Sequence, residues 1–227
     1  MGEAANPVEY AVQSRKSVRG FLPDKVDPAL IRRILTLASW APSGSNIQPW
    51  KVHVVTGERR DALARDLIAA HHSKRPEKRE YQYYPVNWRS PYIDRRRETG
   101  WGLYGLLGIT KGDRDATARQ HAKNFNFFGA PCTLLFAIDA DLGQGSWLDY
   151  GMFLQNIMTL ARSHGLHTCP QAAVANYPDI VKQHLGIPDD QVVVCGIALG
   201  YEDQSEPANQ FRPKRMALDE FVTFHEG

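Results

Sequence analysis

The sequence predicts one domain that combines helices with short buried strands. Two observations support this: apolar residues recur at helical spacing in several segments, and short runs of strand-forming residues follow turn signals. The chain has 227 residues, of which 43% are hydrophobic and 23% are charged, and this composition supports a hydrophobic core of ordinary size. Since we find no internal repeat and no low-complexity linker, we expect a single domain over residues 1–227.

The first elements are predicted from their start signals. Residues 6–9 (Asn-Pro-Val-Glu) place an N-cap, a first-position proline and an early glutamate in register, so a short helix should run to about Gln13. Asp27-Pro28 opens a second helix whose apolar residues share one broad face. Turn formers over residues 41–46 end that helix. The β-rich run Trp50–Thr56 then predicts a strand.

The middle and the end of the chain contain one further helix and two buried strands. Residues 59–72 have helical spacing, whereas residues 73–100 are charged, aromatic and proline-containing without a clear period. We interpret residues 73–100 as a mobile or partner-contacting excursion. The apolar runs Thr133–Ile138 and Gln191–Leu199 are short and follow turn signals, which favours strands buried on both faces.

Residues 148–163 predict a helix with almost no polar face. A helix that is apolar on every side must be buried on every side. We therefore expect it to lie under the sheet with its far side covered by a second subunit. A central helix of a monomer is the alternative.

Charge and termini exclude several classes of function. Lys and Arg number 27 against 25 Asp and Glu, so the formal charge of +2 does not favour a nucleic-acid or membrane-binding surface. The N-terminal residues show no basic start followed by an apolar run, and no window approaches the length of a membrane span. We expect a cytoplasmic protein.

Neither the cysteines nor the paired histidines indicate a metal site. Cys132, Cys169 and Cys195 are widely spaced and odd in number, which favours reduced thiols acting as small buried hydrophobes. His71 and His72 are adjacent, so on a helix their side chains point about 100° apart and cannot hold one metal together. We expect both histidines to be solvated and predict no metal.

One sequence fingerprint is misleading. Residues 100–105 (Gly-Trp-Gly-Leu-Tyr-Gly) match the glycine pattern of dinucleotide-binding turns. That turn must follow a buried apolar strand, and here the charged residues 94–98 precede it. We reject a dinucleotide-binding fold at this position.

Two short basic clusters are the best candidates for a binding site. Residues 15–19 hold three cations and a hydroxyl at the end of the first helix, and residues 212–215 hold three more cations near the C-terminus. In a nearly neutral chain, two such clusters suit one compact dianion such as a phosphate group, because arginine forks match phosphate oxygens. Ordinary solvated surface charge is the alternative.

Five segments together resemble the FMN-dependent nitroreductase family in content and order. They are SRKSVRGF, APSGSNIQPW, FFGAP, the run from CPQAAVANYPDIVKQHLGIPDD to ALGYED, and FRPKRMALDEFVTFH. The resemblance covers about residues 10–225. It implies an α+β fold with a mostly antiparallel central sheet flanked by helices, an intertwined homodimer, and two FMN sites built from both chains.

The resemblance also implies which residues contact the cofactor. The N-terminal basic segment is similar to the one that meets the ribityl phosphate and the pyrimidine edge. The loop of residues 42–46 resembles one that reaches the partner's flavin, and residues 170–173 resemble the segment against the ring. The implied cofactor-binding residues are Arg15, Lys16, Ser17, Arg19, Pro42, Ser43, Gly44, Asn46, Pro170, Gln171, Ala172, Ala173, Arg212 and Arg215.

This chain departs from the family pattern at one informative place. Many members carry a glutamate followed by glycine where this chain has Gln171-Ala172, so the charge near the flavin N5 differs. In the otherwise unmatched residues 73–128, Phe125, Phe127 and Phe128 are expected near a pocket rim.

The implied activity is hydride transfer from NADH or NADPH, through FMN, to a nitroaromatic or similar electron-poor acceptor by a ping-pong mechanism. No side-chain nucleophile or acid–base pair is required, because the cofactor carries the chemistry and Arg19 is expected to tune it. The alternatives are quinone reduction, reductive dehalogenation or flavin fragmentation on the same fold, and a flavin-binding module without turnover.

Overall fold

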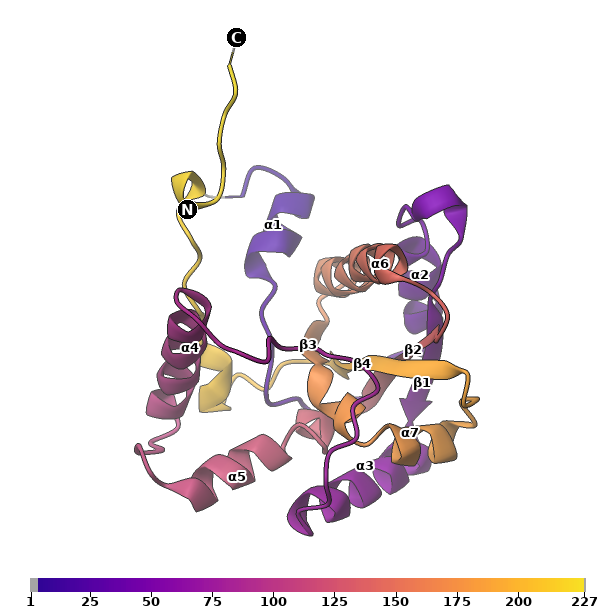
Figure 1. Cartoon of the computed structure of the whole chain (residues 1–227), viewed down its shortest axis with the longest axis vertical. Helices are drawn as coiled ribbons and strands as arrows, with labels where there is room; N and C mark the ends of the chain where they lie inside the picture. The colour runs from indigo at the N-terminus through magenta and orange to yellow at the C-terminus, as the bar shows by residue number, and fades with distance from the viewer. Residues whose placement is uncertain (1–3, 227) are drawn as a thin grey trace.

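The computed structural model describes residues 4–226. Residues 1–3, which belong to the N-terminal stretch considered above for targeting signals, lie outside the described residues. Its centre is one antiparallel sheet of four strands in the order β1-β2-β4-β3 (Figure 1). The strands are β1 (Lys51–Thr56), β2 (Cys132–Asp139), β3 (His167–Gln171) and β4 (Gln191–Gly200). The three strands predicted from apolar runs are confirmed as β1, β2 and β4. The expected α+β class with an antiparallel sheet is confirmed as well.

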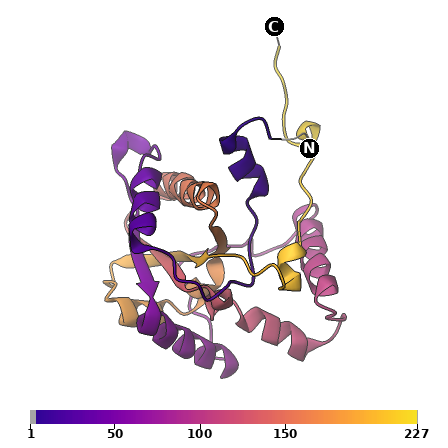
Figure 2. The same ribbon diagram turned by 180° about the vertical axis from the view of Figure 1, so that it is seen from behind.

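Helices cover both faces of this sheet (Figure 1, Figure 2). One face carries α2 and α6, and the opposite face carries α3 and α7. The helices are α1 (Pro7–Ser14), α2 (Pro28–Ala38), α3 (Gly57–His72), α4 (Tyr92–Leu106), α5 (Arg114–Ala122), α6 (Gln144–Ser163) and α7 (Pro178–Leu185). The predicted helices near residues 7, 28, 59 and 148 are confirmed as α1, α2, α3 and α6.

Side-chain alternation along β2 builds two cores from one strand. Leu134 and Phe136 face α2 and α6, whereas Leu135 and Ala137 face α3 and α7, and all four are fully buried. Because successive residues of a strand point to opposite faces, a strand in the middle of a covered sheet must be apolar throughout. This is why β2 and β4 are continuous apolar runs in the sequence.

The predicted start signals cap the first two helices. The Asn6 side chain accepts hydrogen bonds from the backbone N–H groups of Val8 and Glu9, each at 3.0 Å, and Pro7 begins α1. Asp27 accepts one from the N–H of Ala29 at 2.8 Å, and Pro28 begins α2. These bonds satisfy N–H groups that a helix start leaves without partners.

Within one chain, helix α6 is buried on its sheet side and exposed on its far side, and coverage of the far side by a second subunit stays a prediction. Phe153 and Ile157 pack against the sheet, but Leu148 is 74% exposed and Met152 is 41% exposed. These two residues are one helical turn apart and define an outward face. Covering this face requires a second surface.

Residues 73–128 are more regular than the sequence indicates. Residues 92–106 form α4, so the glycine pattern at 100–105 lies inside a helix, which confirms the rejection of a dinucleotide-binding turn. Phe125, Phe127 and Phe128 are buried core residues, at most 7% exposed, so their expected place on a pocket rim is wrong. The local phenylalanine cluster serves the core under α3 instead.

The histidine and cysteine expectations have different outcomes. His72 is exposed, but His71 is half-buried with its ring 4.9 Å from that of Phe125, which corrects the expectation that both are solvated. The three cysteines are free and buried, and burial raises the pKa of Cys132 and of Cys195 to about 12.

Within the described residues, no helix has the length and apolarity to cross a membrane, and no cluster of potential metal ligands occurs.

Candidate functional site

The N-terminal basic segment lies beside strand β3. Ser17 forms a parallel bridge with Thr168, and the Val18 N–H donates to the Thr168 carbonyl at 3.0 Å. Burial raises the pKa of the Cys169 thiol to about 11, and the nearby charges of Arg19 and Arg15 partly oppose this rise. Both guanidinium groups therefore lie close to the middle of β3.

The C-terminal basic cluster meets the N-terminal one at the end of α1. The Arg212 guanidinium donates to the carbonyls of Gln13 and Ser14, each at 3.0 Å. Burial lowers the pKa of Arg15, and the charges of Arg215 and Arg212 lower it further. Two clusters almost 200 residues apart in sequence thus converge, as the sequence predicted for a single anion site.

Within the described residues, the arginines of this convergence have no carboxylate partner, whereas Lys214 is paired with Glu98 at 2.8 Å. Among residues 4–226, neither Arg15, Arg19, Arg212 nor Arg215 forms an ion pair. Gathered guanidinium groups repel one another unless an anion lies between them. The site is therefore suited to a phosphate group.

Lys16 differs from its basic neighbours because it is already paired. Its ammonium lies 2.5 Å from the Glu202 carboxylate and donates to the Asn209 carbonyl at 2.6 Å. His167 contacts the other Glu202 oxygen at 3.2 Å. The Lys16 charge is thus neutralised within the protein. Through these two contacts, Lys16 connects the N-terminal basic segment to residues that follow β4.

Asn209 joins the two basic segments and was not singled out by the sequence analysis. Its Oδ1 accepts from the Arg19 N–H at 2.6 Å, and its Nδ2 donates to the carbonyls of Gly20 and Asp203 at 2.9 and 2.8 Å. Asn209 is 2% exposed. A buried amide with all these partners fixes the backbone path of both segments, residues 19–20 and residues 203–209.

An apolar groove of about 660 Å³ begins where β3 ends. Pro170, Gln171 and Ala172 form one side of it, as the family resemblance implies for the segment against the flavin ring. The Tyr81 and Trp147 rings, 4.7 Å apart, line it as well. Further lining residues that sequence reasoning missed are Gln82, Tyr83, Gln144, Gly151 and Leu154.

Gln171 is the departure from the family pattern, and its side chain is buried. Its Nε2 donates to the Asn124 carbonyl at 2.7 Å, and the residue is 2% exposed. Its Oε1 is buried with no protein partner among the described residues. A neutral amide therefore stands at the base of the groove with one acceptor free.

Within its own chain, the loop of residues 42–46 lies beside the first half of α6, away from the end of α6 that contacts α1. The Gly44 N–H donates to Asp149 near the start of α6, whereas Arg162 near the end of α6 donates to Tyr10 of α1. Asp149 and Arg162 are 13 residues apart in the same helix, which corresponds to roughly 20 Å. Figure 1 and Figure 2 accordingly show α6 lying between α1 and the α2 side of the molecule.

The residues present fit a flat cofactor with a phosphate tail. Arg15 and Arg19 lie near Cys169, and the groove begins at the next residue of β3, Pro170, so the two regions adjoin. The predicted residues that the structure brings together are those of segments 15–19, 170–172 and 212–215.

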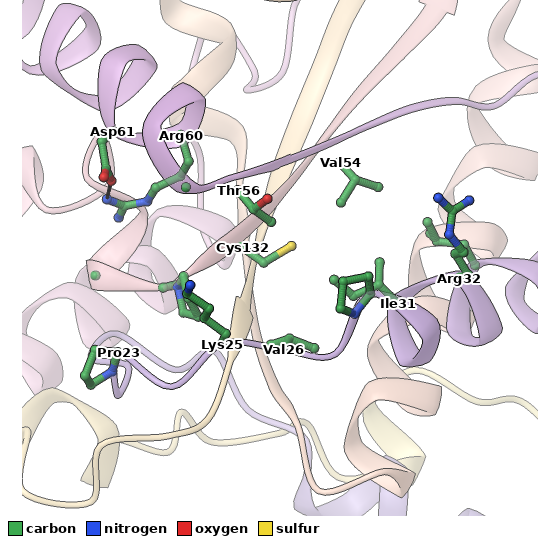
Figure 3. A pocket seen from close by; sticks show the side chains of 16 residues that line it. Pro23, Lys25, Val26, Ile31, Arg32, Val54, Thr56, Arg60, Asp61 and Cys132 are labelled. Atoms are coloured by element: carbon green, nitrogen blue, oxygen red, sulfur yellow. Dashed lines mark hydrogen bonds and ion pairs between the residues drawn. The ribbon is translucent and has the colours of Figure 1, made fainter.

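A second cavity of about 660 Å³ lies at the opposite edge of the sheet (Figure 3). Ile31 and Arg32 of α2, Val54 and Thr56 of β1, and Arg60 of α3 surround it. The strand order places β2 and β4 between this cavity and β3. None of the predicted cofactor-binding residues lines it.

The sequence is similar to known proteins over most of its length. A model of the nitroreductase family matches residues 12–201. The chain is 44% identical over 216 residues to a 4-nitrobenzoate reductase of Pseudomonas putida, which covers 95% of this chain and 94% of the relative. It is 38% identical to a nitrobenzene nitroreductase of Ectopseudomonas oleovorans, covering 96% and 97% of the two chains.

A solved structure shares the whole fold. The FMN-dependent nitroreductase NfnB of Mycobacterium smegmatis, crystallised in complex with NADPH, superposes with a TM-score of 0.94 at 32% identity. The match covers 99% of this chain and 100% of that one.

Proposed function

Because this chain belongs to the nitroreductase family, we propose that it is an FMN-dependent oxidoreductase that reduces a nitroaromatic or similar electron-poor acceptor with NADH or NADPH. The observation that carries this proposal is the uncompensated guanidinium cluster directly beside an apolar, aromatic-lined groove. The overall two-electron reaction consumes NAD(P)H, one proton and a nitro group, and it yields NAD(P)⁺, a nitroso group and water.

We assign distinct roles to the residues around the groove. Arg15, Arg212 and Arg215 hold the phosphate of FMN, and Arg19 stabilises negative charge on the pyrimidine edge of its ring. Bound FMN supplies the redox chemistry, because it accepts and gives up two electrons. Ser17 and residues 170–173 complete the contacts within one chain, and Lys16 aligns the basic segment through Glu202.

The groove itself selects and orients the reactants. Its aromatic side chains offer flat faces against which a nicotinamide or a nitroaromatic ring can stack. A single groove can hold only one of them at a time, so the donor must leave before the acceptor enters. We therefore expect ping-pong kinetics.

We further propose that the protein works as a homodimer of single-domain chains. The exposed face of α6, the free edge of β1 with its adjacent cavity, and the separation of residues 42–46 from the guanidinium cluster all support a second copy. Pro42, Ser43, Gly44 and Asn46 would then contact the flavin of the partner. Three free buried cysteines favour a reducing location, which we take to be the cytoplasm.

The proposal is tested by anaerobic spectroscopy of the purified protein reconstituted with FMN. We expect NADH or NADPH to bleach the flavin absorbance, and a nitroaromatic compound to restore it. A protein that binds FMN but is bleached by neither nucleotide would be a binding module instead. Parallel reoxidation with quinones and halophenols separates nitro reduction from other uses of the same fold.

A further inference from the structure

Two neighbouring residues of α6 hold the loop of residues 42–48 at its two ends. At the start of the loop, the Asp149 carboxylate accepts a hydrogen bond from the Gly44 N–H at 3.0 Å. Just after the loop, the Tyr150 hydroxyl accepts one from the Lys51 N–H at 3.2 Å. The loop held in this way contains the four residues that we propose to contact the flavin of the partner.

The loop itself is exposed and has an unusual backbone. Residues 44–48 are all exposed. Within them, Ser45, Asn46 and Gln48 have φ angles of 50°, 58° and 48°. Residues other than glycine seldom adopt this left-handed region, and where they do, surrounding contacts hold them there, often at functional sites. The loop therefore keeps a costly shape although it packs little of its own surface into the core.

Asp149 is a costly residue at its position. It is 8% exposed, and within residues 4–226 its carboxylate forms no ion pair and accepts only the hydrogen bond from Gly44. Removing a carboxylate from water without a counter-ion is unfavourable. Gly44 is exposed, so water could satisfy its N–H equally well. The stability of one chain therefore does not explain a carboxylate at this place.

The direction of Asp149 separates it from the groove of its own chain. Tyr150 and Gly151 line the apolar groove, whereas Asp149 is not among its lining residues. Successive residues of a helix point about 100° apart, so Asp149 faces the loop while its neighbours face the groove. Asp149 can therefore influence a cofactor only through the loop that it holds.

We propose that Asp149 is a positioning residue, which holds the loop of residues 42–48 in the shape that contacts the FMN bound by the partner subunit. This inference rests on the proposed function and on the proposed homodimer, and it adds a residue that does not touch the cofactor. A loop that is already ordered loses less conformational entropy when the cofactor binds. The oxygen acceptor of Asp149, rather than its charge, has this role.

FMN affinity and loop order test the hydrogen bond in homodimers. Asp149→Leu removes the acceptor, so we expect the dissociation constant of FMN to rise about 3- to 10-fold, as for the loss of pre-ordering in a short segment. Backbone amides of residues 43–48 should exchange faster in the cofactor-free protein. Asp149→Asn keeps an oxygen for the Gly44 N–H and should restore both values.

Asp141→Leu is the matched control, because Asp141 is exposed and lies before the start of α6. It makes the same change of charge and size and should leave FMN affinity unchanged. An FMN affinity equal in Asp149→Leu and wild type would overturn the inference. An Asp149→Asn protein that binds FMN as weakly as Asp149→Leu would also overturn it, because the acceptor would then not be what matters.

Heterodimers test whether Asp149 acts on the cofactor of the partner. One chain carries Arg15→Ala with Arg215→Ala, which disables its own guanidinium cluster, and the other chain carries Asp149→Leu. One site of this dimer then combines the intact cluster of the second chain with the intact loop of the first. In heterodimers purified through two different tags, we therefore expect one FMN to bind with wild-type affinity.

The reciprocal heterodimer joins a chain with all three substitutions to an unchanged chain. Each of its sites lacks either the cluster or the fixed loop, so no FMN should bind with wild-type affinity. A tight site in this heterodimer instead of the first would place the effect of Asp149 within its own chain and overturn the inference, as would equal binding by both heterodimers. A wild-type protein that binds no FMN would count against the proposed function itself.

Discussion

At the scale of single residues, the guanidinium cluster is the feature whose energetics depend most on a ligand. Arg15 loses part of its proton affinity to burial and to the charges of Arg215 and Arg212. The same three charges that repel one another in the free protein attract a dianion together. A substitution in the cluster should therefore act oppositely on the free and on the cofactor-bound protein.

Arg215→Ala tests this opposition. Among residues 4–226, the Arg215 side chain hydrogen-bonds only to the carbonyls of Pro213 and Lys214, so removing it breaks no long-range hydrogen bond there and relieves repulsion at Arg15. We expect the dissociation constant for FMN to rise roughly 10- to 150-fold, the value of one charge-assisted hydrogen bond. The melting temperature of the cofactor-free protein should not fall.

Equilibrium dialysis and thermal unfolding measure the two effects. Arg65→Ala serves as the control, since Arg65 is an exposed arginine of α3 on the other face of the sheet. An FMN affinity equal in Arg215→Ala, Arg65→Ala and wild type would make Arg215 ordinary surface charge.

At the scale of elements, the segment after β4 holds the N-terminal basic segment in place, because the Asn209 side chain hydrogen-bonds to the backbone of residues 19 and 20. Replacing Asn209 by leucine leaves the Arg19 N–H without its acceptor, whereas the carbonyls of Gly20 and Asp203 lose one of two donors and keep the N–H groups of Asp203 and Glu206. A donor left without an acceptor costs about 1–3 kcal/mol. We expect a lower free energy of unfolding and, because the two basic segments are no longer aligned, weaker FMN binding.

Urea unfolding of the cofactor-free protein and FMN titration under folding conditions report these two effects separately. Asn87→Leu, at an exposed asparagine, is the control and should change neither. If Asn209→Leu lowers stability while FMN affinity stays at the wild-type value, Asn209 supports the fold but does not align the site.

Elements with strong local signals were predictable, and those without them were not. Caps at Asn6 and Asp27 and apolar runs in β2 and β4 are properties of adjacent residues, so sequence reasoning found them. Helix α4 buries no residue completely and contains three glycines, so neither its periodicity nor its propensity identified it. It packs against residues 207–211, which lie about 100 residues further along the chain.

The candidate site was predictable in the same uneven way. The basic clusters and residues 170–172 belong to short recognisable segments, and the structure brings them together as expected. Tyr81, Trp147 and Asn209 acquire their roles only through folding, because their partners lie far away in sequence. No local pattern distinguishes them from other aromatic or amide residues.

At the scale of the whole molecule, at least two surfaces of the single chain lack cover. One is the outward face of α6 with Leu148 and Met152, and the other is the free edge of β1 beside the cavity of Figure 3. Exposed apolar patches and open sheet edges favour association. The loop of residues 42–46 lies near the start of α6, so association through this side would carry it toward a second copy.

The assembly and the cofactor site should therefore fail together when the outward face of α6 is charged. Met158, which packs against the core of its own chain, is unsuited to this test, whereas Met152 is exposed and structurally free to change. Met152→Lys would place an ammonium group where a second copy is expected, and burying it unpaired would cost several kcal/mol. We expect sedimentation to show monomers that remain folded by circular dichroism. Because residues 42–46 would then be missing from each site, FMN should dissociate more readily although no cofactor ligand of that chain was changed.

Leu106→Lys, on an exposed position of α4, is the control and should stay dimeric and flavinated. A Met152→Lys protein that is monomeric, fully flavinated and fully active would show that each chain holds its cofactor alone.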